Sequence, residues 1–244
     1  MGQHGKHRPL VTGAARAALC VAILPWFPGA AAASECRLAL ALALDVSRSV
    51  DAREHALQRG GLIAALRAPE VRRAFFAVPL PVALAVYEWS GPTEQHLLLD
   101  WVLIRAPGDL DGVADRLARA PRNGTEAPTA MGQALLYGAA LMARGPDCLF
   151  RTIDISGDGE NNEGPGPQDV YALPGFDAIT VNGLPINGAE YETEIQLIPW
   201  FLDNVRHGPG AFIEVAQGFA DFERAMAAKL ERELSGLVIG TVLP

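Results

Sequence analysis

The 244-residue sequence is poor in several residues and motifs that mark common functional classes. After residue 33 it contains a single lysine, Lys229. His55, His96 and His207 stand alone in the same part, without the spacing of a zinc site. There is no Gly-x-Ser-x-Gly sequence, no P-loop and no dinucleotide-binding fingerprint. These absences argue against a zinc protein, an α/β-hydrolase and a nucleotide-binding enzyme.

Positive charge is also scarce. Three of the 20 basic residues but none of the 28 acidic residues precede residue 34, so the remainder carries a net charge of about −11. No stripe of basic residues is left that could follow a nucleic acid or an anionic membrane surface, and we exclude both as partners. An acidic chain is instead suited to binding cations.

The first 33 residues have the composition of a secretory signal peptide. Basic residues precede an apolar stretch at residues 17–24, and small residues suited to cleavage follow at residues 30–33. An uncleaved membrane anchor is the alternative, but Pro25 and Pro28 interrupt a stretch that is already short for a bilayer. No later apolar run is long enough to span a membrane. We therefore expect a periplasmic or secreted protein, with residues 34–244 as its domain.

Apolar runs of strand length alternate along this domain with segments of helical spacing. We expect strands at residues 38–45, 81–89, 96–104, 149–156, 177–184 and 211–216, the second and third forming a hairpin. We expect helices at residues 50–66, 109–120, 129–144, 189–205 and 219–234, the first capped by Ser49, and a helical stub at residues 169–173. The pattern predicts an α/β fold: a Rossmann-like, mainly parallel sheet with helices on both faces and one antiparallel edge strand.

Asp45 ends the first apolar strand, and Ser47 and Ser49 follow it at alternate positions. At the end of a strand, alternate side chains can converge on one point. One carboxylate and two hydroxyls make a hard oxygen site, which suits magnesium, manganese or calcium better than zinc. Asp158 ends the strand at 149–156 in a similar way, and a Rossmann-like order would place the two aspartates on adjacent central strands.

Two cysteines precede these aspartates at similar distances along the sequence. Cys36 lies nine residues before Asp45, and Cys148 lies ten residues before Asp158. If the aspartates end neighbouring parallel strands, the cysteines lie at the opposite ends at similar height. We therefore predict a Cys36–Cys148 disulfide, which would contribute on the order of 4 kcal/mol by closing a long loop. Two free thiols are the alternative.

Three segments together resemble the metal-ion-dependent adhesion site of von Willebrand factor type A domains. Asp45-x-Ser47-x-Ser49 resembles its first element, Thr129 in TAMGQAL its second, and Asp158 in TIDISGDGENN its third. Over nearly all of the domain, the sequence is similar to secreted bacterial proteins of unknown function with a von Willebrand type A-like domain. The stretches that carry this similarity are TIDISGDGENNEGP, ITVNGLPI and GPGAFIEVA.

The resemblance implies a ligand set and a function. The hydroxyls of Ser47, Ser49 and Thr129 and the carboxylates of Asp45 and Asp158 would hold a divalent cation, with Mg²⁺ the first choice and Mn²⁺ or Ca²⁺ also suitable. An open coordination position would take an acidic side chain of a partner protein, which makes the domain a binding or adhesion module. Thr125, four residues earlier, could replace Thr129. Glu160, Asn161, Asn162, Glu163 and Asn182 would border the cation, either shaping selectivity or forming a solvated turn.

The sequence is compatible with two other functions. GDGENN also resembles the last motif of haloacid-dehalogenase-like phosphatases, with Asp45 as nucleophile. However, Ser47 stands where those enzymes usually carry a second aspartate, and Lys229 is the one lysine left to neutralise a phosphate. A scaffold domain without a metal is the third reading. Asp154, inside an apolar strand, is expected to bind a neighbouring loop rather than a metal.

Overall fold

The computed structural model describes residues 1–2, 5, 34–123, 126–188 and 196–240, and side chains up to residue 236. Almost all of the expected signal peptide, Thr125 and the first part of the expected helix at 189–205 lie outside these residues. No helix in the described ranges combines the length and the apolar character needed to cross a membrane.

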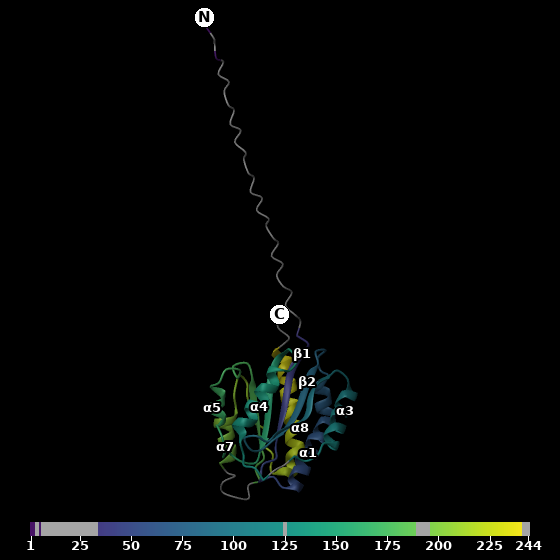
Figure 1. Cartoon of the computed structure of the whole chain (residues 1–244). Helices are drawn as coiled ribbons and strands as arrows, with labels where there is room; N and C mark the ends of the chain where they lie inside the picture. Colours follow the sequence, from purple (N-terminus) through teal and green to yellow (C-terminus); the bar gives the residue numbers. More distant parts are fainter. Residues whose placement is uncertain (3–4, 6–33, 124–125, 189–195, 241–244) are drawn as a thin grey trace. The chain divides into compact units, whose positions relative to one another are not determined.

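The central strand is β1 (Cys36–Asp45), and each of its residues is buried. It pairs in parallel with β2 (Val82–Trp89) on one side and with β4 (Cys148–Gly157) on the other. The edges are β5 (Thr180–Pro185), parallel to β4, and β3 (Gln95–Ile104), antiparallel to β2. The sheet order β3-β2-β1-β4-β5 confirms the predicted α/β fold, with one antiparallel edge strand (Figure 1).

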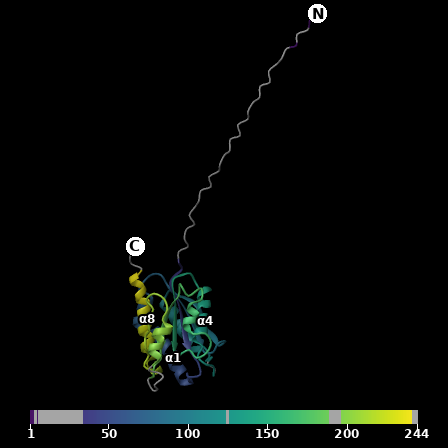
Figure 2. The ribbon, with the colours of Figure 1, turned by 90° about the vertical axis from the view of Figure 1, so that its left-hand side faces the viewer.

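Helices cover both faces of this sheet, because the side chains of β1 alternate between two hydrophobic layers. Its leucines face α1 (Ala52–Arg67), α2 (Pro69–Phe75), α3 (Pro107–Arg119) and α8 (Phe222–Gly240). Its alanines face α4 (Met131–Ala143), α5 (Pro167–Tyr171), α7 (Leu197–Trp200) and the π-helix η1 (Phe201–Val205). Figure 2 shows α8 and α4 on opposite sides of the molecule.

Glycine lets α4 lie close to the alanine side of the sheet, as its composition predicts. A Cβ atom at Gly138 would come within 2.7 Å of the Tyr87 hydroxyl and 2.8 Å of Ile153 Cδ1. The close approach packs α4 against the alanine face of β1. It also places the start of α4 at the end of the sheet where β1 and β4 finish. Thr129, two residues before α4, is carried to that edge.

Two local predictions, the cap at Ser49 and the strand at residues 211–216, were wrong, and one helix was not predicted. Asp51 caps α1 in place of Ser49, accepting hydrogen bonds from the N–H groups of Arg53 and Glu54. A second helix, α2, begins at Pro69, since proline is well suited to the first turn of a helix as well as to ending one. Residues 211–216 make two isolated bridges, from Ile213 to Gly183 of β5 and from Ala216 to Ile186, rather than a continuous strand. Before α8, a short 3₁₀ helix, η2, spans Phe219–Asp221.

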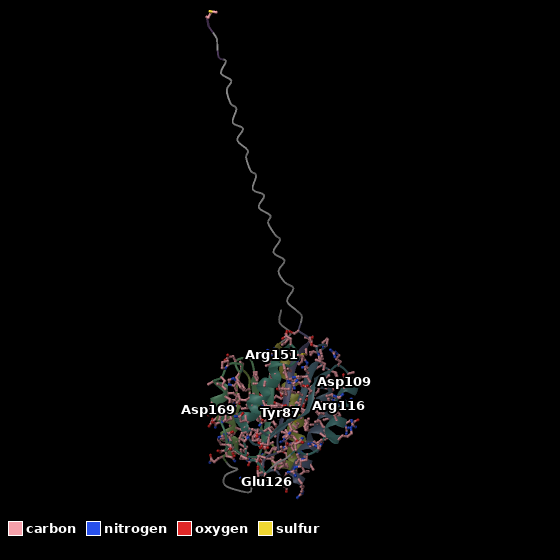
Figure 3. All side chains as sticks on the ribbon, viewed as in Figure 1. Tyr87, Asp109, Arg116, Glu126, Arg151 and Asp169 are labelled. Atoms are coloured by element: carbon pink, nitrogen blue, oxygen red, sulfur yellow. A yellow bond between two sulfur atoms is a disulfide. The ribbon has the colours of Figure 1, made fainter. Side chains whose placement is uncertain are left out.

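The two ends of the sheet differ in chemistry. At the amino end, Cys36 and Cys148 are paired in register and joined by the predicted disulfide, with Cα atoms 4.5 Å apart. At the carboxyl end lie Asp45, Asp158 and the loop that contains Thr129. In Figure 3, Arg151, near the start of β4, and Glu126, in the Thr129 loop, mark these opposite ends.

Candidate metal centre

Asp45 is the last residue of β1 and is completely buried. Its Oδ1 atom accepts a hydrogen bond of 2.8 Å from the backbone N–H of Ser47, which turns the chain sharply after the strand. Its Oδ2 atom is buried and has no hydrogen-bond partner among the described residues. A buried carboxylate oxygen without a donor is costly, so this oxygen would gain from a positive partner.

The three predicted hydroxyls lie next to this carboxylate in one chain of contacts. Thr129 Oγ1 is 3.4 Å from Ser47 Oγ, and Ser47 Oγ is 3.3 Å from Ser49 Oγ. Ser49 Oγ donates a hydrogen bond of 2.7 Å to Asp158 Oδ1. Oxygen atoms from three distant segments, β1, the Thr129 loop and the end of β4, therefore gather at one edge of the sheet. Ser49 takes part here because Asp51 caps the helix.

Asn161 and Asn162 fix the Thr129 segment to the loop after β4. Thr129 donates its backbone N–H to Asn162 Oδ1 at 2.9 Å, and its carbonyl accepts the backbone N–H of Asn162 at 2.9 Å. Asn161 Oδ1 lies 3.3 Å from the N–H of Gly132 in the first turn of α4. The predicted bordering residues thus hold the second and third elements of the site together.

Asp158 supplies the second carboxylate and affects the first. Burial, together with the nearby charge of Asp158, raises the pKa of Asp45 to about 8, although hydrogen bonds from Ser47 and the backbone N–H of Asp158 oppose the shift. Between the two aspartates stands Gly157, where a Cβ atom would come within 3.0 Å of Asp45 Oδ2. A residue with a side chain at this position would crowd the buried oxygen.

A cavity of about 470 Å³ opens beside these oxygens. Its lining includes Ser49, Thr129, Asp158, Glu160, Asn161 and Asn162. The structure therefore places three of the predicted bordering residues at the site. Glu163 donates its backbone N–H to the Thr129 carbonyl at 3.3 Å.

Asn182 does not lie in this group, contrary to expectation. It is inside β5 and faces α8, where its side chain donates to Glu233 Oε1 at 3.1 Å and accepts from the backbone N–H of Phe212 at 2.9 Å. Because side chains alternate along a strand, Asn182 lies on the face of the sheet that α8 covers. A shift of one residue in the strand would have placed it on the opposite face.

Asp154 is not a ligand either, but its partner differs from the one expected. Its carboxylate forms a buried ion pair with Lys229 of α8, rather than a bond to a loop. Both side chains are almost fully buried, Asp154 at 3% exposure and Lys229 at 0%. The one lysine of the domain is therefore occupied far from the predicted ligands, in the interface between α8 and the sheet.

A buried polar cluster around Glu88 was missed at the sequence level. Glu88, near the end of β2, is fully buried and accepts hydrogen bonds from His55 and Arg59 of α1 and from Asn123. His55 is thus a buried partner of a carboxylate. A lone glutamate in the apolar strand PVALAVYEW was the available signal, because buried carboxylates need partners.

The group fits a divalent cation. Two carboxylates and three hydroxyls offer only oxygen, which hard cations prefer, and the unpartnered Oδ2 of Asp45 would gain the positive partner that it lacks. In the described part of the chain, no set of three or more His, Cys, Asp or Glu side chains could hold a metal, so the hydroxyls would be essential ligands. Thr129 is the threonine that the structure places in this group.

Comparisons with known proteins agree with this architecture. The model of a family described as "Protein of unknown function (DUF1194)" matches residues 35–238. A comparison with curated proteins gives no match.

Among solved structures, the chain shares the von Willebrand factor type A fold. Proximal thread matrix protein 1 from the mussel byssus, solved with a zinc-occupied MIDAS motif, matches with a TM-score of 0.56 and 16% identity over 83% of this chain and 49% of that one. The PilB minor pilin from Streptococcus sanguinis matches with a TM-score of 0.63 and 11% identity, over 86% of this chain and 64% of that one. A von Willebrand factor type A protein from Catenulispora acidiphila matches with a TM-score of 0.54 and 12% identity, over 82% of this chain and 43% of that one. The chain thus spans 43% to 64% of the length of these proteins.

Proposed function

The chain belongs to the DUF1194 family of proteins of unknown function, and from this starting point we propose that it is an exported binding module that depends on a metal ion. The cation would be held by Asp45, Ser47, Ser49, Thr129 and Asp158. It would bind an acidic side chain of a partner protein.

The observation that carries this proposal is the state of Asp45. Its carboxylate is completely buried, one oxygen has no hydrogen-bond partner among the described residues, and the nearest charge acting on it is the negative charge of Asp158. Within the described ranges, no Lys, Arg or His forms an ion pair with it, although two other buried carboxylates, Glu88 and Asp154, each have one. A divalent cation would supply the missing positive charge.

The donor set favours Mg²⁺, with Mn²⁺ and Ca²⁺ as further candidates. Three of the five donors are neutral hydroxyls, so a bound cation would keep enough positive charge to attract an external carboxylate. The cavity of about 470 Å³ beside Ser49, Thr129 and Asp158 provides the space from which such a group would approach. Similar folds in a minor pilin and in a byssus matrix protein support an adhesive role.

Export is supported by two features of the chain. Its first 33 residues have the composition of a secretory signal peptide. A disulfide joins the other two cysteines, and disulfides persist mainly in oxidising compartments such as the periplasm and the cell exterior.

Metal binding is tested first by calorimetric titration of the purified protein with MgCl₂ and MnCl₂. We expect saturable binding that falls at least tenfold in a Ser47→Ala variant. Ser156→Ala is the matched control: it removes another buried serine hydroxyl, which donates to the carbonyl of Ala43 at 3.1 Å and not to the oxygen group. Absence of binding in the wild type, or equal losses in both variants, would contradict the proposal.

Partner binding is tested by capture from the cell-envelope fraction with Mn²⁺ or with EDTA. We expect a partner that is retained with Mn²⁺, released by EDTA and not captured by Ser47→Ala. Blocking the carboxylates of the captured protein should abolish its retention. A partner retained equally in EDTA would contradict a metal-bridged contact.

No described residue favours the phosphatase alternative. Lys229, the lysine that could neutralise a phosphate, is buried in its ion pair with Asp154. We therefore propose a non-enzymatic module. Phosphatase activity that disappears in Asp45→Asn would overturn this part of the proposal.

A further inference from the structure

The buried cluster around Glu88 joins α1 to the chain that leads to Thr129. Glu88 Oε1 lies 2.7 Å from His55 Nε2 and also accepts a hydrogen bond from Arg59. Glu88 Oε2 accepts hydrogen bonds from Asn123, from the side-chain amide at 3.1 Å and from the backbone N–H at 3.3 Å. One oxygen of the carboxylate therefore holds a helix, and the other holds the start of a loop.

Arg59 strengthens the same connection. Besides Glu88, its guanidinium donates to the carbonyl of Ala120 and, at 2.9 Å, to the carbonyl of Pro121. Arg59 is 8% exposed, so these bonds are made largely out of water, where loss of a partner is most costly. Two side chains of the cluster, Arg59 and Glu88, thus hold residues 120, 121 and 123.

The far side of the same loop is tied to the metal-binding elements directly. The N–H of Arg48, between the two serines, donates to the carbonyl of Ala127 at 2.9 Å. The N–H of Ala130 donates to the carbonyl of Ser90 at 2.9 Å, two residues after Glu88. The end of β2 therefore holds the chain on both sides of Thr129, through Glu88 before it and Ser90 after it.

The cluster is more elaborate than a helix–sheet contact requires. Burial alone would raise the pKa of Glu88, but hydrogen bonds from His55 and Arg59 bring it below its usual value. Arg59 and His55 would suffice to neutralise a carboxylate that only anchors α1. The bonds from Arg59 also tie α1 to the carbonyl of Ala120 at the end of α3, whereas the two bonds from Asn123 to Glu88 act on the chain that leads to Thr129.

We infer that Glu88 is a positioning residue for the metal centre: through Arg59 and Asn123 it holds the Thr129 loop where the Thr129 hydroxyl meets Ser47. This inference rests on the proposed metal-binding function. Removing the cluster's hold on the loop should weaken metal binding without removing any ligand. Groups that orient metal ligands in this way are typically worth tenfold to a hundredfold in affinity.

The test is the affinity for Mn²⁺, measured by calorimetry on the full chain, with electron paramagnetic resonance of the bound ion. We expect Glu88→Gln to weaken binding on the order of tenfold or more and to broaden the spectrum. Asn123→Ala removes the side-chain bond from the loop at a half-buried position, so it should fold normally. We expect it to weaken binding severalfold.

Two controls separate positioning from general loss of stability. Asp154→Asn disrupts the other buried ion pair, and Asn204→Ala removes a half-buried asparagine that donates to the carbonyl of Trp200. We expect both to bind Mn²⁺ within twofold of the wild type. If Asn123→Ala also stays within twofold, or if Asp154→Asn loses as much affinity as Glu88→Gln, the inference is wrong while the proposed function stands. A wild type that binds no Mn²⁺ would instead overturn the proposed function.

Discussion

Asp45 and Asp154 are buried carboxylates on the two central strands of the sheet, and they have opposite surroundings. Asp154, in the middle of β4, meets the ammonium group of Lys229, which α8 brings into the core. Asp45, at the end of β1, meets a backbone N–H, serine hydroxyls and a second carboxylate. A buried charge is stable only when it is compensated. The chain compensates Asp154 itself, whereas no ion pair compensates Asp45 within the described residues.

The difference accounts for the structural role of Asp154 and for the proposed role of Asp45 as a ligand. Asp154 lies beneath a helix, where a long side chain can reach it and water cannot. Asp45 lies at the carboxyl edge, where strands give way to loops and a solvent cavity opens nearby. Position along the strand, more than residue type, therefore separates the two roles.

The largest expected effect comes from breaking the internally compensated pair. Lys229→Met should lower the free energy of unfolding by about 3–5 kcal/mol, because Asp154 would stay buried without a cation. Urea denaturation measures the loss. The double variant Lys229→Met/Asp154→Leu should recover much of it, since neither charge of the pair remains. A double variant as unstable as Lys229→Met would show that the packing of α8 on the sheet does not depend on this ion pair.

The second prediction concerns compensation from outside. Mn²⁺ at about a hundred times its dissociation constant should raise the free energy of unfolding of the wild type by about 2.7 kcal/mol over the value in EDTA. Asp45→Asn should show almost none of this gain, whereas Lys229→Met should keep it despite its lower stability. Thermal or urea unfolding with and without Mn²⁺ measures both. An equal gain in Asp45→Asn would place the cation elsewhere.

The most gradual effect is the pH dependence that an uncompensated Asp45 produces in EDTA, because it is spread over several pH units. The pKa of Asp45 is raised to about 8 in the folded protein, so between roughly pH 4 and pH 8 the folded state binds more protons than the unfolded one. The free energy of unfolding should therefore fall as pH rises through this range, by up to ~1.4 kcal/mol per pH unit. Glu233, whose pKa burial and Asp154 also raise, contributes a similar trend.

Asp45→Asn isolates the contribution of Asp45, because Glu233 titrates in both proteins. The difference between the two stability curves, recorded in EDTA, should slope with pH and should disappear when Mn²⁺ is present. Parallel curves in EDTA would mean that Asp45 is already compensated within the chain.

Much of the architecture follows from the sequence alone. Apolar runs of strand length, separated by segments of helical spacing, predicted the mainly parallel sheet and its antiparallel edge, because periodicity reflects which faces are buried. The distances from Cys36 to Asp45 and from Cys148 to Asp158 predicted a disulfide at one end of the sheet. Asp45, Ser47 and Ser49 at the end of a strand indicated where oxygen ligands collect.

Other features were decided only by the tertiary structure. Local rules allow either Ser49 or Asp51 to cap α1, and the proximity of Asp158 to Ser49 depends on chain more than a hundred residues away. Asn182 contacts Glu233 of α8, and Lys229 pairs with Asp154. Such partners depend on strand register and on where a helix crosses the sheet, which local sequence does not determine. The sequence by itself determined which segments form strands and where oxygen ligands can gather. The fold decided which buried carboxylate is paired within the chain and which is left facing the loops, because only long-range packing brings a charge from one element to another.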